Sequence, residues 1–285
     1  MSDRPLFSIV VTTFDRAAYL RQALESVRRQ TVTDWECIVV DDASPVPVRV
    51  PQDARFRLVR RDSNGGEPVA RNTGLRAARG SYVAFLDDDD LFTPDRLEHA
   101  LQGLGKAPVS VCWRRGLDGS TGGNRLLEGD VRDRILDNLT PQLGQVAIHR
   151  SIVPRFDERY AGGPDVEWWL RVATEWPVSS VPRVGLLYRQ HTGPRNRNGL
   201  RARIDGSLRL LEEHADYFAT HPRAAAFRWK RIGLTARRTR DLRFARTAFL
   251  RSLRLRPQIS TAWHLVRVLR SSGSAVGNIE ESRAA

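Results

Sequence analysis

Four consecutive aspartates, Asp87 to Asp90, directly follow the short apolar run Tyr82–Leu86. The run is aromatic and β-branched and is bounded by Gly80, a pattern that predicts a short buried strand. Four carboxylates at the end of such a strand repel one another, so folding does not favour them unless a cation or a cationic ligand offsets the charge. In open α/β sheets, ligands bind at the carboxyl ends of strands.

Two interpretations of this acidic run stay open. Hard divalent ions such as magnesium and manganese take oxygen ligands, often one or two carboxylates together with substrate phosphates. The run therefore fits a metal that holds a phosphorylated substrate. The other interpretation is a solvated turn in which Asp90 or Thr93 caps a helix that begins near Pro94.

Strand and helix patterns alternate through the first hundred residues. Strand-like runs occur at 7–12, 37–40, 56–59 and 82–86, and helical spacing occurs at 19–30 and 69–78. This βαβ alternation predicts the α/β class, with a mostly parallel sheet covered by helices. Further along the chain, the pattern indicates helices at 96–104 and 166–174 and strands at 109–113, 145–148, 178–181 and 184–188.

Length and composition limit the classes of protein to consider. The 285 residues suffice for a full core, as one large domain or as a domain with an extension. No apolar run approaches the ~20 residues that span a bilayer, and the N-terminus lacks a signal-peptide pattern. We therefore expect a cytoplasmic protein, either soluble or peripheral at the inner face of the membrane. Cys37 and Cys112 lie in apolar runs and indicate buried thiols, not a disulfide or a zinc site.

Positive charge is concentrated toward the C-terminus. Residues 201–285 hold 18 Lys+Arg and 7 Asp+Glu, a net charge of +11, whereas residues 1–200 hold 28 and 26, a net charge of +2. The stretch 200–270 has a helical pattern, and Ser271–Ala285 is expected to be a frayed tail. Three interpretations of the basic helices stay open: a cap packed on the rest of the chain, a surface that docks on anionic lipid, or a nucleic-acid surface. No nucleic-acid motif is present, so we expect no nucleic-acid partner.

The strand ends resemble those of one family. The chain resembles the family 2 inverting glycosyltransferases of the GT-A fold through four segments in order, SIVVTTFDR (8–16), VVDDAS (39–44), ARNTGL (70–75) and FLDDDD (85–90). Downstream, DVEWWLR (165–171) is similar to the family's acceptor-side motif, and YRQH (188–191) is similar to its closing motif. Together these segments cover residues 6–192.

The resemblance implies a GT-A fold, in which a Rossmann-like, mostly parallel central sheet is flanked by helices. We expect a catalytic domain over 1–199, with a nucleotide-sugar-binding half at 1–92 and an acceptor half at 93–199, followed by an arginine-rich helical extension over 200–285. The implied reaction moves a sugar, with inversion, from a nucleoside-diphosphate sugar to a hydroxyl acceptor. A UDP-sugar is the first expectation, with Mn²⁺ or Mg²⁺ as cofactor and a glycan, glycolipid or metabolite as acceptor.

The resemblance also assigns the donor side of the site. The donor-binding residues are Thr12, Phe14, Asp15, Asp42, Arg71, Asp87 and Asp88, with Asp89 as the metal ligand and His191 as a contact to the metal or diphosphate. In this assignment Asp42 accepts from the uracil. Simpler interpretations stay open: a capping turn for Asp42, a core position for Phe14 and a surface ion pair for Arg71. A lone histidine such as His191 is often incidental.

An inverting transfer needs a carboxylate that takes the proton of the acceptor hydroxyl. The resemblance assigns this role to Asp165, although Pro164 stands where the family has glutamate, and Glu167 is the alternative base. Asp165 also fits the N-cap of the helix that follows it. Trp168 and Trp169 are candidates for an apolar platform under the sugar or acceptor, with at least one of them expected in the core.

Two other functions fit part of the pattern. Sugar nucleotidyltransferases also place aspartates and a metal on an α/β sheet, but they need a Gly-rich phosphate loop, and residues 12–17 contain no glycine. A non-catalytic carbohydrate- or membrane-binding relative is disfavoured by the intact D-x-D pair, Asp87 and Asp89, together with Asp165. A dehydrogenase would need GxGxxG after the first strand, which is absent.

Overall fold

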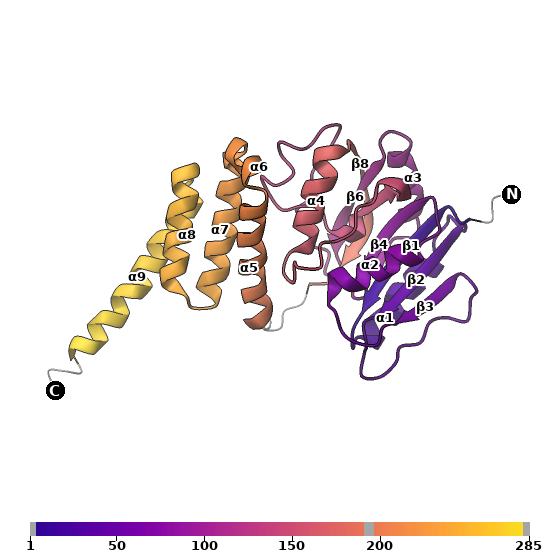
Figure 1. Ribbon diagram of the computed structural model, residues 1–285, viewed down its shortest axis with the longest axis horizontal. Coiled ribbons are helices and arrows are strands. Elements are labelled where there is room, and N and C mark those ends of the chain that lie inside the picture. The colour runs from indigo at the N-terminus through magenta and orange to yellow at the C-terminus, as the bar shows by residue number, and fades with distance from the viewer. Residues whose placement is uncertain (1–3, 191–196, 282–285) are drawn as a thin grey trace. The chain divides into compact units, whose positions relative to one another are not determined.

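The computed structural model describes residues 4–190 and 197–281, which form two compact units (Figure 1). The first, here called the sheet unit, comprises Met1–Ile135, Leu139–Arg159 and Pro164–Thr192. The second, here called the helical unit, comprises Leu136–Asn138, Tyr160–Gly163 and Gly193–Ala285. Two short loop segments of the first 200 residues thus belong to the helical unit.

The sheet unit is built on a mixed sheet that has eight strands over the described residues. The strands are β1 (Phe7–Thr13), β2 (Trp35–Asp41), β3 (Phe56–Arg60), β4 (Tyr82–Asp87), β5 (Leu91–Phe92), β6 (Val109–Gly116), β7 (Val146–His149) and β8 (Val178–Tyr188). Their order is β3-β2-β1-β4-β7-β6-β8-β5, and Figure 1 labels six of them, β1 to β4, β6 and β8. The pairs β3–β2, β2–β1, β1–β4 and β6–β8 are parallel, and β7 and β5 run antiparallel to their neighbours. The predicted α/β class is confirmed.

Helices cover this sheet because their apolar residues recur at helical spacing. They are α1 (Ala17–Arg28), α2 (Glu67–Ala77), α3 (Arg96–Leu104) and α4 (Pro164–Glu175), with short 3₁₀ turns η1 (Leu143–Gln145) and η2 (Arg150–Ile152). On α1, Leu20, Leu24 and Val27 are buried in one cluster with the sheet residues Ile9 and Val39. Each such side chain stabilises the fold by about 1.5–3 kcal/mol.

Three local expectations were wrong. Residues 178–188 form one strand, because β8 passes Pro182 at an irregularity in its pairing with β6, where the register shifts beside Trp113. Helix α3 has Asp95 at its N-cap, so neither Asp90 nor Thr93 caps it. Helix α4 begins at Pro164, whose fixed φ suits the first helical position, so Asp165 lies inside the first turn and is not the N-cap.

The helical unit consists of α5 (Arg197–Glu213), α6 (Ala215–Thr220), α7 (Pro222–Arg238), α8 (Leu242–Leu255) and α9 (Ile259–Glu281). Its core joins Ile204, Ile232, Ala236, Ala245, Ala248, Phe249 and Val268. Gly233 permits the close approach of α7 and α8, since a Cβ there would lie 2.7 Å from the Phe249 ring. The helical pattern expected for 200–270 is observed, but α9 continues to Glu281, where a frayed tail was expected from Ser271. No described helix is long and apolar enough to cross a membrane.

Candidate functional site

A cavity of about 460 Å³ opens in the sheet unit where β1, β2 and β4 end. It is lined by Thr12, Thr13, Phe14, Arg16, Asp42, Asn64, Gly66, Glu67, Ala70, Asp87, Asp88 and Asp89. In the parallel register, Thr12 of β1 is level with Asp87 of β4, and Thr13 is level with Asp41 of β2. The carboxyl ends of these strands therefore meet at one edge of the sheet, where α/β proteins bind ligands.

The acidic run divides between the cavity and the interior. Asp88 is buried and accepts hydrogen bonds from Thr13 Oγ1 at 2.7 Å and from Arg16 at 3.3 Å. Burial raises the pKa of Asp88 to about 6, against the lowering effects of Thr13 and Arg16. Asp89 accepts from the same arginine at 2.7 Å. One cation therefore contacts both carboxylates at the cavity wall.

The fourth aspartate points to a different role. Asp90 is buried, does not line the cavity, and accepts a hydrogen bond from the Arg189 backbone N–H at 2.8 Å. Burial raises its pKa to about 8, and the negative charge of Asp87 adds to this effect. Because Asp88 and Asp90 are both buried, the interpretation of the run as a solvated turn was wrong.

Arg71 of α2 lies against the acidic run. Its guanidinium donates to Asp87 Oδ1 at 3.0 Å and lies 3.2 Å from Glu67 Oε2 and over the Phe156 ring. The side chain is only 6% exposed, so the interpretation as a surface ion pair was wrong. Burial acts to lower the pKa of Arg71, but the charges of Glu67, Asp87 and Asp165 outweigh it and raise the pKa above its usual value.

The two base candidates on α4 differ in their partners. Asp165 is half-buried in the first turn of the helix and acts on Arg71 through its charge. Glu167 is buried, and its two oxygens accept from Arg171 at 2.6 and 2.7 Å. A carboxylate engaged by two guanidinium donors is less available to accept a proton. The geometry therefore favours Asp165 over Glu167.

Asp42 and Asp15 hold the loops around the cavity. Asp42 is buried, pairs with Arg61 and accepts from the backbone N–H groups of Gly65 (3.1 Å) and Gly66 (2.8 Å). It therefore positions the loop before α2 while lining the cavity. Asp15 adopts φ 55° and donates from its backbone N–H to Ser44 at 2.9 Å, but it does not line the cavity.

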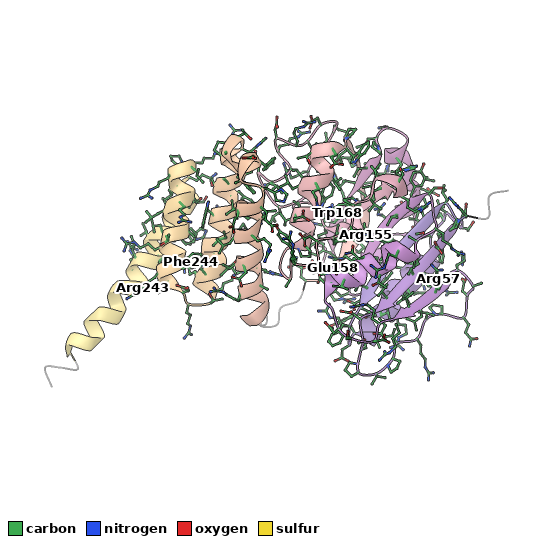
Figure 2. All side chains as sticks on the ribbon, in the orientation of Figure 1. Arg57, Arg155, Glu158, Trp168, Arg243 and Phe244 are labelled. Atoms are coloured by element: carbon green, nitrogen blue, oxygen red, sulfur yellow. The ribbon has the colours of Figure 1, made fainter. Side chains whose placement is uncertain are left out.

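The aromatic candidates lie in other environments than those considered from the sequence. Phe14 is 45% exposed and lines the cavity, so the core position considered for it was wrong. Trp168 of α4 (Figure 2) and Trp169 are both fully buried, and their indole N–H groups donate to the carbonyls of Pro154 and Pro141. Both belong to the core because they lie on the inward side of α4, so the platform proposed for a sugar was wrong.

Several cavity residues were not identified from the sequence. Arg16 follows Asp15 in the first strand segment, and that adjacency to a strand end was the only available signal. Asn64 reaches the wall from the loop before α2, where Gly66 adopts φ 82°. Asn72 exchanges two 2.8 Å hydrogen bonds with the Phe156 backbone and so joins α2 to the segment that precedes α4. His191 lies outside the described residues.

Curated relatives match in sequence over the N-terminal part. A protein of Haemophilus influenzae, named an uncharacterized glycosyltransferase, is 38% identical over 105 residues, which are 36% of each chain. The succinoglycan biosynthesis protein ExoW of Rhizobium meliloti is 43% identical over 102 residues, 33% of this chain and 32% of ExoW. The matches thus span about a third of the length of these relatives.

Solved structures match over most of the chain. TarS of S. aureus, residues 1–349, in complex with UDP-GlcNAc aligns with a TM-score of 0.59 and 16% identity over 94% of this chain and 92% of TarS 1–349. The mannosyltransferase PcManGT of Pyrobaculum calidifontis, in complex with GDP-Man and Mn²⁺, aligns with a TM-score of 0.58 and 17% identity. The alignment covers 99% of this chain and 83% of PcManGT. At this identity the likeness shows the fold, and the predicted GT-A fold is confirmed.

The family assignment rests on the segment that forms this cavity. The sequence model of the family described as "Glycosyl transferase family 2" matches residues 8–157, more than half of the chain. The match takes in β1, β2, α2 and β4, which supply the cavity walls. This chain belongs to glycosyl transferase family 2.

Proposed function

We propose that this chain is a metal-dependent inverting glycosyltransferase that moves a sugar from a nucleoside-diphosphate sugar, first of all a UDP-sugar, to a hydroxyl acceptor. The observation that carries the proposal is the cavity of about 460 Å³ at three strand ends, lined by Phe14, Asp42 and Asp87–Asp89. Its volume suits a small ligand. The UDP-GlcNAc bound by TarS and the GDP-Man bound by PcManGT support a nucleotide sugar as that ligand.

The donor would lie along the cavity wall from Phe14 to the acidic run. The half-exposed Phe14 ring offers a face on which a base stacks, and Asp42 holds the loop at Gly66 beside it. The backbone around Gly66 and Glu67 opens α2, and a helix N-terminus favours an anion. The diphosphate therefore fits between this helix start and the aspartates, and Arg16 and Glu67 lie at its edges.

The residues present fit a divalent metal. Magnesium and manganese are commonly held by one or two carboxylates plus substrate phosphates, so a cage of many side chains is not required. The Arg16 guanidinium lies 2.7 Å from Asp89 and 3.3 Å from Asp88, so these carboxylates already bind one positive charge at the position where a metal ion would bind. Asp89 would hold the metal, with Asp87 and Asp88 beside it. When bound, the ion would offset negative charge on the departing diphosphate.

The proton of the acceptor would go to Asp165. As the acceptor oxygen attacks the anomeric carbon, the O–H proton passes to the Asp165 carboxylate and the bond from the sugar to the diphosphate breaks on the opposite face. Arg71 is charged and lies within electrostatic reach of both Asp87 and Asp165. By donating to Asp87 Oδ1 at 3.0 Å, it fixes that carboxylate on the donor side of the cavity.

The acceptor class follows from the relatives. The names of ExoW, a succinoglycan biosynthesis protein, and of WcaA of Escherichia coli, a putative colanic acid biosynthesis glycosyl transferase, both refer to polysaccharide biosynthesis. We therefore favour a glycan acceptor for this chain, with a glycolipid or a metabolite as the other acceptor classes. The binding partners are then the donor nucleotide sugar and this hydroxyl acceptor.

Donor turnover tests the proposal. The full chain is incubated with UDP-glucose, UDP-galactose, UDP-GlcNAc, GDP-mannose or a dTDP-sugar, with Mn²⁺, Mg²⁺ or EDTA, and release of the nucleoside diphosphate is measured. We expect slow release from one donor class, dependent on metal, and a product sugar of inverted anomeric configuration by NMR. Release of pyrophosphate from a nucleoside triphosphate and a sugar phosphate would instead indicate a nucleotidyltransferase, and retention of configuration would contradict the assigned role of Asp165.

A further inference from the structure

The last helix of the helical unit presents apolar side chains to solvent. Ile259 is 92% exposed and Trp263 is 53% exposed, and Val266 and Leu269 are also exposed. These residues, here called the α9 stripe, recur at intervals of four, three and three and so lie on one side of the helix. Eleven residues of helix, 259–269, thus expose four large apolar side chains, whereas exposed apolar residues on a soluble protein are usually scattered.

The opposite side of α9 is already used by the core. Val268 and Thr261 are buried, Val268 belongs to the apolar cluster of the helical unit, and His264 stacks on the Phe249 ring. The α9 stripe therefore does not serve the packing of the helical unit. Such a surface needs another explanation than core formation.

Arginines accompany the stripe. Arg267 lies with its guanidinium 4.6 Å above the Trp263 ring, and Arg270 is exposed one turn further along. Residues 241–270 contain seven arginines and one acidic residue, Asp241, a net charge of +6. Tryptophan and aliphatic side chains next to arginines are the composition of helices that lie in the interface of an anionic bilayer.

We propose that the α9 stripe docks on an anionic lipid bilayer, with the apolar side chains at the level of the acyl chains and Arg267 and Arg270 at the head groups. A second copy of the chain is the less suitable occupant, because a two-fold contact over the stripe would bring these arginines close to their own counterparts. Nucleic acid is also less suitable, because aliphatic side chains neither neutralise phosphates nor donate hydrogen bonds to them. The proposal stands on the helical unit alone and does not depend on the proposed transferase activity.

Vesicle flotation of the full chain tests the proposal. Vesicles of phosphatidylcholine with 30% phosphatidylglycerol are compared with pure phosphatidylcholine, each at low and high salt. We expect binding to the anionic vesicles at low salt, weaker binding at high salt and none to the neutral vesicles. Arg267→Gln with Arg270→Gln should weaken binding about 25-fold, since each arginine near such a surface contributes about a factor of five.

Matched variants separate the stripe from general charge and hydrophobicity. Trp263→Ser with Val266→Ser should weaken binding at least about tenfold. The pair Arg150→Gln with Arg223→Gln removes the same charge from other exposed positions, and Val46→Ser with Leu126→Ser removes exposed apolar residues of the sheet unit; each should leave binding within about twofold. All eight substituted positions, four on α9 and four in the control pairs, are exposed, so each variant is expected to fold, and an unchanged melting temperature checks this.

Three outcomes would overturn the proposal. The first is no flotation of the wild-type chain with anionic vesicles. The second is an equal loss of binding in the control pairs, which would mean that the whole surface charge and not the α9 stripe is responsible. The third is a dimer in analytical ultracentrifugation that the Trp263→Ser and Val266→Ser pair converts to a monomer, which would assign the stripe to a second copy.

Discussion

In the sheet unit charged side chains lie inside the fold, whereas in the helical unit they surround an apolar core. Asp41, Asp88, Asp90 and Arg71 of the sheet unit are buried and paired near the cavity. Among the described residues of the helical unit, Arg228 is the buried charged side chain, and the core is made of alanine, isoleucine, valine and phenylalanine.

This difference indicates where a ligand changes stability. A buried carboxylate lowers stability unless a cation or hydrogen bonds compensate it, so a cationic ligand that reaches Asp87–Asp89 should stabilise the sheet unit. Among its described residues the helical unit buries one charged side chain, Arg228, so its stability should depend mainly on apolar packing. The predictions below test this division from the largest expected effect to the smallest.

The largest effect is expected on catalysis in the sheet unit. Asp165→Asn keeps the size of the side chain but removes the proton acceptor, so kcat should fall by about 10²–10⁴ while the dissociation constant of the nucleoside diphosphate changes little. Glu175→Gln, an exposed carboxylate at the other end of α4, is the matched control and should keep its activity. Turnover by Asp165→Asn near the wild-type rate would refute the assignment of the base.

The next effect concerns packing in the helical unit. Phe249→Ala removes a fully buried ring and should reduce the free energy of unfolding by about 3–5 kcal/mol. Leu255→Ala at an exposed position of the same helix should change it by about 0.5 kcal/mol or less. Calorimetry with and without nucleotide and metal should show that the stabilisation by ligand survives Phe249→Ala. Loss of that stabilisation would contradict the division between the units.

A smaller effect is expected where α2 meets the segment around Phe156. Asn72→Ala leaves the buried Phe156 N–H and C=O without their partner, which should lower the free energy of unfolding by about 2–4 kcal/mol. Thr73→Ala, one residue further along α2, removes a hydroxyl that bonds only within its own helix and should cost about 0.5 kcal/mol. Chemical denaturation measures both, and equal costs would show that the link to Phe156 is not structural.

The smallest effect, taken over one pH unit, is a dependence of stability on pH. The pKa of Asp90 is raised in the fold from 3.8 to about 8, so its contribution to stability is fully present below pH 3.8 and is lost as the pH rises toward 8. Asp90→Asn abolishes that loss, and in EDTA its advantage over wild type should grow between these limits by at most about 1.4 kcal/mol per pH unit. Asp62→Asn at an exposed position should show no such growth, and a pH-independent difference for Asp90→Asn would contradict the burial of charge.

The fold could be predicted where local pattern and tertiary packing agree. The apolar runs of β1 and β4 and the spacing of α1 indicated the parallel sheet, and the expected bounds of α3, 96–104, are those observed. Residues 178–188 could not be predicted as one strand, because a proline in a strand usually ends it and only the irregular pairing with β6 accommodates Pro182 here.

The candidate site could be predicted only as far as strand ends are visible in sequence. Asp87–Asp89 follow an apolar run, so their meeting with Thr12 at one edge was expected. The burial of Asp90, the contact of Arg16 with Asp89 and the stacking of Arg71 on Phe156 join residues between 73 and 99 positions apart. No local sequence pattern encodes contacts across such separations along the chain. The burial of both tryptophans of α4 likewise could not be predicted from local pattern.

The central claim is that the strand-end cavity binds a nucleoside diphosphate through a metal at Asp89. Thermal unfolding of the wild-type chain and of Asp89→Ala, with UDP, GDP, dTDP or ADP and with Mn²⁺ or EDTA, tests it most directly. One diphosphate should stabilise the wild type by about 2.7 kcal/mol at a hundred times its dissociation constant, only with Mn²⁺ and not in Asp89→Ala. No stabilisation by any of them, or stabilisation that persists in EDTA and in Asp89→Ala, would contradict the account.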